Sequence, residues 1–277
     1  MRIQHNIPAL SSHRNLSNNN SAVTKNLEKL SSGYRINRAG DDAAGLAISE
    51  KMRAQITGLQ TAQKNAEDGV SLVQTAEGAL TEVHSMLNRM VELATQSANG
   101  TYSDKNREEM QKEIDALNAE IDRIGETANF NGTKLFDGKT DEIALHVGES
   151  SADTNQIKVT LTAMSSSSIG KGKTDVSAID ITTAAGAKTA IDTINEAIDG
   201  ISSQRSDFGA LQNRLEHTIN NLGVQTENIT AAESRIRDVD MAKEMMAYTK
   251  NNILVQASQA MLAQANQIPQ GVLQLLQ

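Results

Sequence analysis

The stretch that decides the fold is Leu30–Gln55, LSSGYRINRAGDDAAGLAISEKMRAQ, a short break between two helical patterns. Gly33 and Gly40 flank a basic segment, and glycine relaxes the backbone where a helix should stop. Asp41 can act as the N-cap of the next helix, and Asp41 and Asp42 both complement the positive end of its dipole. The sequence therefore predicts one helix before this break and another after it.

The helix before the break follows a weak heptad stripe over residues 9–34. His13 and Asn20 occupy two of its positions, so a lone helix of this quality is marginal in water. After the break the stripe resumes without a gap from residue 48 to residue 94. Its spacing is close to the 3.5-residue period of a coiled coil, which predicts one long helix over residues 42–98.

The rest of the chain mirrors this order. Asn99-Gly100 marks a stop, Ser103 or Asp104 can cap a further helix, and its seam continues to Ala128. Residues 129–186 contain turn dipeptides, short alternating runs and many Ser, Thr and Gly residues, which favour a small β region. Helical spacing then returns to the end of the chain. We predict a mainly α fold: a long antiparallel helical hairpin or coiled-coil rod with a small β-hairpin region at its tip.

The composition excludes several function classes. A net charge of −8 argues against nucleic-acid binding, and no stretch approaches the eighteen apolar residues of a membrane span. There is no cysteine for a disulfide or thiolate site. The five histidines are scattered, and Gly172-Lys173-Thr174 lacks the rest of a phosphate-binding loop because Ser167 replaces its first glycine. We therefore expect no catalytic residues, no cofactor, no metal, no nucleic acid and no membrane partner.

The two end segments require a functional explanation, because their stripes are too weak to stand alone and too regular for a disordered tail. Such segments commonly order on association. A chain with apolar seams at both ends and no chemical site is typical of a polymer subunit. The predicted terminal coiled-coil seam consists of Leu16, Val23, Leu27, Leu30, Met245, Tyr248, Val255 and Leu262.

Several long phrases resemble bacterial flagellin. They include LEKLSSGYRINRAGDDAAGLAISEKMR, ELATQSANGT, EIDRIGETANFNGTKLF, FGALQNRLEHTINNL, AAESRIRDVDMA and QANQIPQGVLQLL, in the order expected for that family. The resemblance covers residues 1–136 and 185–277, and the chain looks like a short form with little or no outer variable domain. It implies a structural subunit, not an enzyme, that self-assembles into the helical filament used for swimming.

The resemblance also implies an organisation. Segments 1–41 and 238–277 would form the inner coiled-coil core domain, and residues 42–237 an outer helical domain that includes the β tip over 129–186. Between them lies a spoke of about residues 31–45. Its characteristic residues in this chain are Gly33, Arg35, Arg38, Asp41 and Asp42.

The partners that the resemblance implies are other copies of the chain, the filament cap and hook-junction proteins, and an export chaperone on the C-terminal helix. It implies export through the flagellar type III system to an extracellular filament. Host Toll-like receptor recognition of the free monomer is a further expectation. The positions that match the receptor or interprotofilament surface are Arg89, Leu93, Glu113, Ile194 and Ile198.

Two other protein classes remain as alternatives. A hook–filament junction protein shares the terminal helices, although the long matches in residues 42–237 favour flagellin. A chemoreceptor-type signalling coiled coil would need a membrane span and longer uninterrupted heptads.

Overall fold

The computed structural model describes residues 6–138, 142–170 and 172–275. The first five and last two residues of the predicted terminal segments lie outside the described residues, as do residues 139–141 and 171 of the predicted β region. The chain divides into two compact units. We call residues 6–56 with 227–275 the terminal unit, and residues 57–226 the bundle unit.

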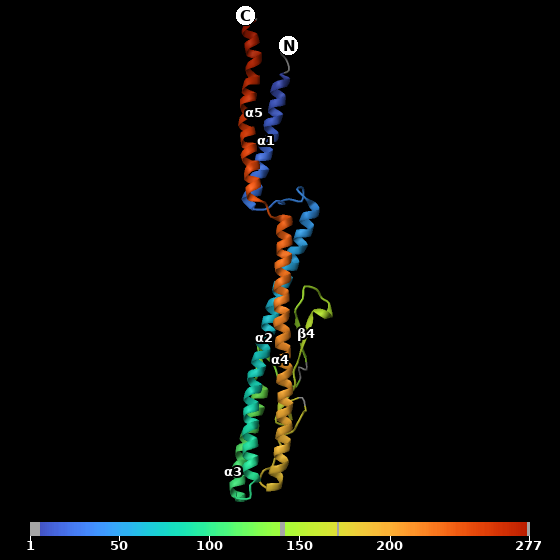
Figure 1. The fold of residues 1–277 in the computed structure, drawn as a ribbon, viewed down its shortest axis with the longest axis vertical. Helices are drawn as coiled ribbons and strands as arrows, with labels where there is room; N and C mark the ends of the chain where they lie inside the picture. The colour runs from blue at the N-terminus through green and yellow to red at the C-terminus, as the bar shows by residue number, and fades with distance from the viewer. Residues whose placement is uncertain (1–5, 139–141, 171, 276–277) are drawn as a thin grey trace. The chain divides into compact units, whose positions relative to one another are not determined.

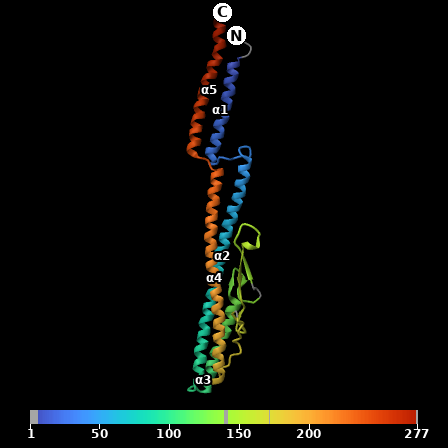
Figure 2. The same cartoon turned by 45° about the vertical axis from the view of Figure 1, so that its right-hand side comes forward.

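The terminal unit is built around two long helices, α1 (Ile7–Ser32) and α5 (Met241–Leu275). They lie side by side in both views of the ribbon (Figures 1 and 2) and run antiparallel, because residue 6 contacts residue 265 and residue 26 contacts residue 251. The Asn6 side chain caps the start of α1 by accepting a hydrogen bond from the Ala9 N–H at 3.2 Å. Gly33 ends α1 with a left-handed φ of 76°, which glycine adopts at little cost.

The other elements of the terminal unit are the first part of α2 (Ala43–Ala98) and the last part of α4 (Ala184–Arg237). Both helices continue into the bundle unit. As the sequence predicts, the stripe after the break forms one helix of 56 residues.

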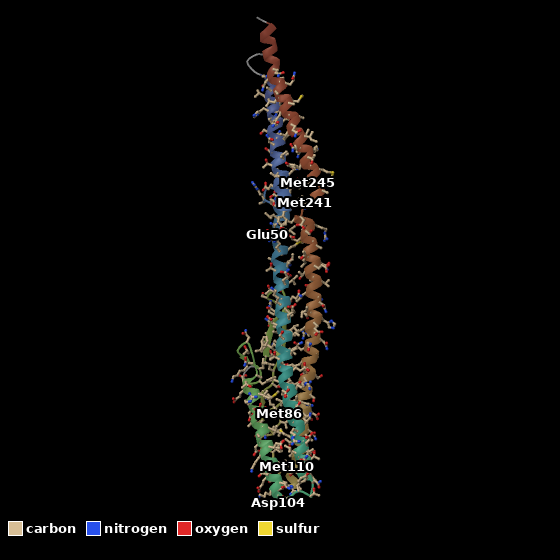
Figure 3. The ribbon with its side chains drawn as sticks, turned by 90° about the vertical axis from the view of Figure 1, so that its left-hand side faces the viewer. Glu50, Met86, Asp104, Met110, Met241 and Met245 are labelled. Carbon is tan, nitrogen blue, oxygen red and sulfur yellow. The ribbon has the colours of Figure 1, made fainter. Side chains whose placement is uncertain are left out.

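The bundle unit packs α2 and α4 with α3 (Asp104–Thr127), which Ser103 caps through its side chain. Aliphatic residues that are fully buried form its core: Leu80, Val83, Leu87, Ile114, Ile121, Ile194 and Ile201, with Phe208. Such a core is expected of a chain with few aromatic residues. Figure 3 shows Met86 and Met110 within this bundle and Asp104 at the start of α3.

Among its described residues, the bundle unit also contains three short antiparallel strand pairs: β1 (Asn129–Phe130) with β2 (Thr133–Lys134), β3 (Glu142–His146) with β4 (Gln156–Thr160), and β5 (Met164–Ser165) with β6 (Ser168–Ile169). In the longest pair Glu142 lies opposite Thr160 and His146 opposite Gln156. A 3₁₀ turn, η1 (Asp153–Asn155), precedes β4. The predicted turn dipeptide Asn131-Gly132 joins β1 and β2 with positive φ at both residues.

The strand pairs lie along the sides of the helices rather than at the tip of the helical hairpin, where the sequence predicts them (Figure 1). Amide side chains hold them there: Asn65 Nδ2 donates to the His146 carbonyl at 2.9 Å, and Gln204 Nε2 donates to the Thr160 carbonyl at 3.1 Å. The apolar faces of the strands add to the helical core through Ile157 and Val159. The mainly α fold with small antiparallel strand pairs is confirmed. Among the described helices, none has the length and hydropathy needed to cross a bilayer.

Candidate assembly surface and spoke

The contact between α1 and α5 follows a heptad, but its apolar layers alternate with polar ones. Five partly buried residues lie off the heptad spacing: Ala22, Glu28, Lys29, Ala247 and Asn252. The heptad positions, all partly or fully buried, are Ala9, Ser12, Leu16, Asn19, Val23, Asn26 and Leu30 on α1 and Glu244, Tyr248, Asn251, Val255, Ser258, Leu262 and Ala265 on α5. Spacings of three and four alternate without error on both helices. We call these positions the seam.

Hydrogen bonds join the two helices at two polar layers of the seam. Asn19 Nδ2 donates to Ser258 Oγ at 3.0 Å, and Asn251 Nδ2 donates to Asn26 Oδ1 at 3.5 Å. Just before α1 begins, Asn6 Nδ2 donates to the Ala265 carbonyl at 2.8 Å. A polar residue in a coiled-coil core must be paired in this way, because burying an unpaired amide is unfavourable.

The structure brings together six of the eight residues predicted for the terminal coiled-coil seam. Leu16, Val23, Leu30, Tyr248, Val255 and Leu262 are half-buried in the α1–α5 contact. Leu27 and Met245 lie outside it, with 54% and 49% of their surface exposed. Apolar residues at heptad spacing predict Leu27 as a seam position, whereas the seam passes through its neighbour Asn26.

The outward-facing sides of this helix pair carry many apolar side chains. Among the described residues, all large apolar side chains that are exposed belong to the terminal unit, except Tyr102 and Val224. Nine lie on the two helices and form what we call the outer stripe: Ile7, Leu10, Leu27, Met241, Met245, Met246, Ile253, Leu254 and Met261. Large apolar side chains that gather on the exposed sides of one helix pair mark an interaction site.

The spoke is held by its two aspartates, whose roles differ from the prediction. Asp42, not Asp41, is the N-cap of α2, since its Oδ1 accepts from the Gly45 N–H at 2.9 Å. Asp41 instead accepts from the backbone N–H groups of Asn37 and Arg38 at 3.3 and 3.2 Å. These two bonds, that from Arg38 first, hold the pKa of the Asp41 carboxyl below its ordinary value. Asp41 therefore closes a turn over residues 37–41, and the helix cap lies one residue later, at Asp42.

The basic residues of the spoke point in different directions. Arg38 makes an exposed ion pair with Glu28 of α1, with 2.8 Å between Nε and Oε1. Arg35 reaches the end of α4, where one terminal nitrogen donates to the Ile236 carbonyl at 2.6 Å. Between them Ile36 is buried, with 2% exposed, and it packs against Gly45 of α2.

Arg237, at the end of α4, completes the spoke and is not among the residues predicted for it. Its Nη1 lies 2.6 Å from Oε1 of Glu50 on α2, and its guanidinium carbon lies 4.8 Å from the centre of the Tyr34 ring. The hydrogen bond from Arg237 keeps the pKa of the Glu50 carboxyl below its ordinary value. Figure 3 labels Glu50 on α2. No local pattern links Arg237 to Glu50, because 187 positions separate them.

The five residues predicted for a receptor or interprotofilament surface do not form one surface. Arg89 and Glu113 meet across α2 and α3, with 2.8 Å between Nε and Oε1, and both are nearly half exposed. Leu93 and Ile194, with 2% and 0% exposed, belong to the bundle core. Ile198 is half-buried. Direct contact by Leu93 or Ile194 would require this core to open.

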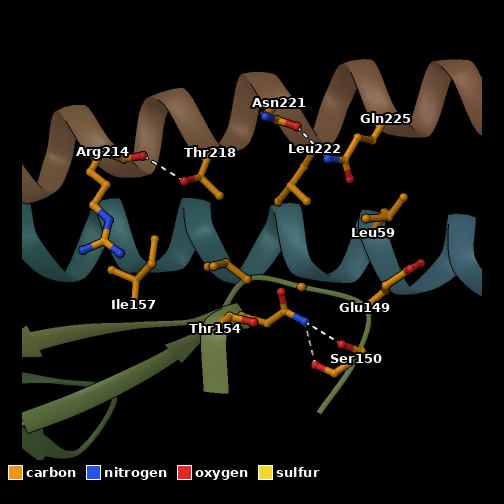
Figure 4. Close-up of a pocket in the computed structure, with 13 residues that line it drawn as sticks. Leu59, Glu149, Ser150, Thr154, Ile157, Arg214, Thr218, Asn221, Leu222 and Gln225 are labelled. Carbon is orange, nitrogen blue, oxygen red and sulfur yellow. Dashed lines mark hydrogen bonds between the residues drawn. The ribbon is translucent and has the colours of Figure 1, made fainter. Parts of the chain in front are cut away.

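Figure 4 shows one of the cavities of the bundle unit. It has a volume of about 420 Å³ and lies between the loop that joins β3 to β4 and the helices α2 and α4. Leu59, Ile157 and Leu222 line it with apolar surface, and Arg214 and Glu149 are its ionisable groups. No histidine lines it, nor any hydroxyl paired with a base. Elsewhere in the described residues, no group of three His, Asp or Glu side chains is placed to hold a metal ion.

Comparison with known proteins agrees with these features. The bacterial flagellin N-terminal helical region matches residues 3–141, and the bacterial flagellin C-terminal helical region matches residues 191–276. A flagellin of Halalkalibacterium halodurans is 57% identical over 276 residues, and one of Bacillus subtilis is 54% identical over 305 aligned residues. Both alignments cover 100% of this chain and of the relative.

A solved structure shares the fold. The putative flagellar hook-associated protein of Vibrio parahaemolyticus aligns with a TM-score of 0.62 at 16% identity, over 72% of this chain and 100% of that one. At that identity the likeness concerns the fold alone. The two matching helical regions and the full-length relatives establish that this chain belongs to the bacterial flagellin family, the structural subunits of the flagellar filament.

Proposed function

We propose that this flagellin polymerises through its terminal unit into the helical, extracellular filament used for swimming, and that it has no catalytic role. The observation that carries the proposal is the outer stripe, which leaves apolar side chains of α1 and α5 exposed on a helix pair whose seam is itself half polar. Other copies of the chain are the partner that would cover this stripe.

Burial of the outer stripe would supply the driving force for assembly. Each Å² of apolar surface removed from water contributes about 25 cal/mol. Ordering of the end segments opposes this gain. The nine exposed apolar side chains of α1 and α5 can therefore support contacts between copies that a single copy does not make.

Truncation tests the proposal. Purified full-length protein and a chain lacking residues 1–40 and 238–277 are compared by light scattering and electron microscopy after seeding. The full-length protein is expected to form uniform filaments, while the trimmed chain stays monomeric and helical. Monomers from both would contradict a filament role and favour the hook–filament junction alternative, whose fold is shared but which would not form a long homopolymer.

Single substitutions locate the contact more sharply. Ile253, 60% exposed on the outer stripe, is changed to Lys; Gln256, an exposed polar residue one turn further along α5, receives the same change as a matched control. Ile253→Lys is expected to raise the protein concentration needed for polymerisation at least tenfold, and Gln256→Lys to leave it nearly unchanged. Equal effects would mean that charge on α5, rather than loss of apolar contact, controls assembly.

The domain organisation follows as part of the proposal. Residues 1–41 and 238–277 act as the inner core domain, residues 31–45 as the spoke and residues 42–237 as the outer helical domain. Contact with the filament cap and hook-junction proteins would use the same terminal surfaces that join copies to each other.

Two further partners belong to the unpolymerised chain. An export chaperone for the type III route would cover the exposed methionines of α5, such as Met246 and Met261, because flexible thioether side chains adapt to varied partners. A host Toll-like receptor would bind the exposed Arg89–Glu113 pair on the bundle unit. Loss of receptor activation by Arg89→Glu, with unchanged helicity, would support that contact; full activation would remove it.

A further inference from the structure

The methionines of this chain differ sharply in exposure. Of the ten in the sequence, four lie on α5, and their exposed fractions are 48% for Met241, 49% for Met245, 68% for Met246 and 65% for Met261. The described methionines elsewhere are partly or fully buried: Met52, Met86, Met90, Met110 and Met164. Among the described residues, α5 therefore carries every exposed methionine.

The exposure of these four side chains does not depend on how α5 packs against α1. None of the four is a seam position, so the α1–α5 contact covers none of them closely. Separation of the two helices would uncover more surface and would cover none. The four thioethers are therefore open to solvent in a copy that has no partner on α5, whether or not its end segments are ordered.

An exposed thioether can be oxidised by a peroxide. The sulfur lone pair attacks one oxygen of hydrogen peroxide, an S–O bond forms and the O–O bond breaks. The proton of the transferred hydroxyl passes to the departing hydroxide, so the products are a sulfoxide and water. Sulfur loses the electron pair that the peroxide gains. The apolar side chain becomes a polar one, and this would happen at four of the nine residues of the outer stripe.

We propose that the four methionines of α5 form an oxidation site that controls whether a free copy can join the filament. This inference rests on the proposed function, since the stripe that other copies would cover contains all four. A sulfoxide oxygen buried against another copy without a hydrogen-bond partner is unfavourable, so oxidised copies are excluded from assembly. Copies already in a filament have these sulfur atoms covered and resist the oxidant. Enzymatic reduction of the sulfoxides restores the apolar stripe.

Peptide mass spectrometry tests the site. Full-length protein is treated with hydrogen peroxide once as free copies and once as filaments, and the sulfoxide at each methionine is followed with time. In free copies the α5 methionines are expected to oxidise about tenfold faster than Met90 and Met164, which are buried in the core. In filaments this excess should disappear. The proposal is wrong if the α5 methionines react no faster than the core, or equally fast in both forms.

Polymerisation of the treated protein tests the consequence. Peroxide is expected to raise the protein concentration needed for polymerisation about tenfold, and methionine sulfoxide reductases should reverse the rise. A variant that combines Met241→Leu, Met245→Leu, Met246→Leu and Met261→Leu keeps the stripe apolar and should polymerise equally well before and after peroxide. The matched control combines Met52→Leu and Met86→Leu, two half-buried positions on α2, and should stay as sensitive as the parent.

The outcomes separate this inference from the proposed function. Untreated parent that forms no filaments would overturn both. Untreated parent that polymerises while treated parent polymerises equally well would overturn the oxidation site alone, as would a four-leucine variant as sensitive to peroxide as the parent. If that variant does not assemble at all, the reductases decide. Treated parent that stays unpolymerised after its α5 sulfoxides have been reduced contradicts the proposal.

Discussion

The two units of this chain contain the same types of aliphatic side chain but bury them to different degrees. In the bundle unit Leu80, Val83 and Leu87 are fully buried by the unit itself. In the α1–α5 seam the most buried side chains described are Ala265 and Asn26, with 6% and 8% exposed, and the leucines and valines are only half covered. A helix in a three-helix bundle has neighbours on two sides, whereas each helix of a pair has one.

The difference shows which unit buries its own apolar side chains and which unit leaves them exposed. A bundle unit that buries its own core can fold by itself, and its described surface exposes few large apolar side chains. The terminal unit leaves the outer stripe exposed and fills half of its seam layers with polar residues. Its stability must therefore come from contacts that one copy does not contain.

The largest expected effect comes from the bundle core. Phe208, 1% exposed, lies among buried aliphatic residues, so Phe208→Ala is expected to lower the free energy of unfolding by about 3–5 kcal/mol. Val255→Ala removes two methyl groups from the half-exposed seam and should cost about 1 kcal/mol or less. Urea unfolding of unpolymerised protein, followed by circular dichroism, measures both. A seam effect as large as the core effect would contradict the contrast between the units.

Substitution of two glycines by alanine tests how closely the bundle unit is packed. A Cβ on Gly125 of α3 would collide with the Met164 carbonyl, whereas a Cβ on Gly78 of α2 would meet open space. Gly125→Ala is expected to destabilise by about 1–3 kcal/mol through overpacking. Gly78→Ala should stabilise by about 0.5–1 kcal/mol, because alanine restricts the unfolded chain and favours helix. Effects of the same sign in thermal unfolding would show that the α3–β5 contact is loose.

Much of the bundle unit could be predicted because helical spacing is a local signal. The run from residue 48 to residue 94 has the period of one helix, and the structure contains that helix without a break. The caps were predictable to within one residue. Asp42 rather than Asp41 starts α2 because Asp41 is used to close the turn after Asn37, and both candidates have the same side chain.

Other features could not be predicted, since they depend on contacts between distant segments. Gln111 and Asn118 of α3 bind the backbone of Ile179 and Val176, and Asp122 binds Ser166, which fixes an irregular segment that has no period of its own. The seam presents a different difficulty. Apolar residues at heptad spacing indicate Leu27 rather than Asn26 as the seam position. Only the partner residues on α5 show that Asn26 faces the other helix.

A smaller effect is expected from that asparagine layer. Asn26→Leu leaves Asn251 without its partner in a partly buried position and should destabilise the helix pair by about 1 kcal/mol. Adding Asn251→Leu makes the layer apolar, and the double variant should recover the loss or exceed the parent. Hydrogen exchange along α1 and α5 in assembled filaments provides the measurement. If the double variant is weaker than either single variant, the polar layer contributes more than paired hydrogen bonds.

The smallest effect concerns pH and the spoke. Arg237 lowers the pKa of the Glu50 carboxyl in the folded chain below its ordinary value of 4.5. A lowered folded pKa means that ionised Glu50 stabilises the fold fully above the ordinary value, and that this contribution is lost as pH falls through the folded pKa. The parent should therefore melt above Glu50→Gln at pH 7, and the two melting temperatures should converge toward pH 3. Because Glu50 is exposed, solvent screens the pair and keeps the difference small. A difference in melting temperature that persists at pH 3 would show that shape, not charge, links Glu50 to Arg237. The bundle unit does not contain this pair and serves as the control, since it should melt at the same temperature in both proteins.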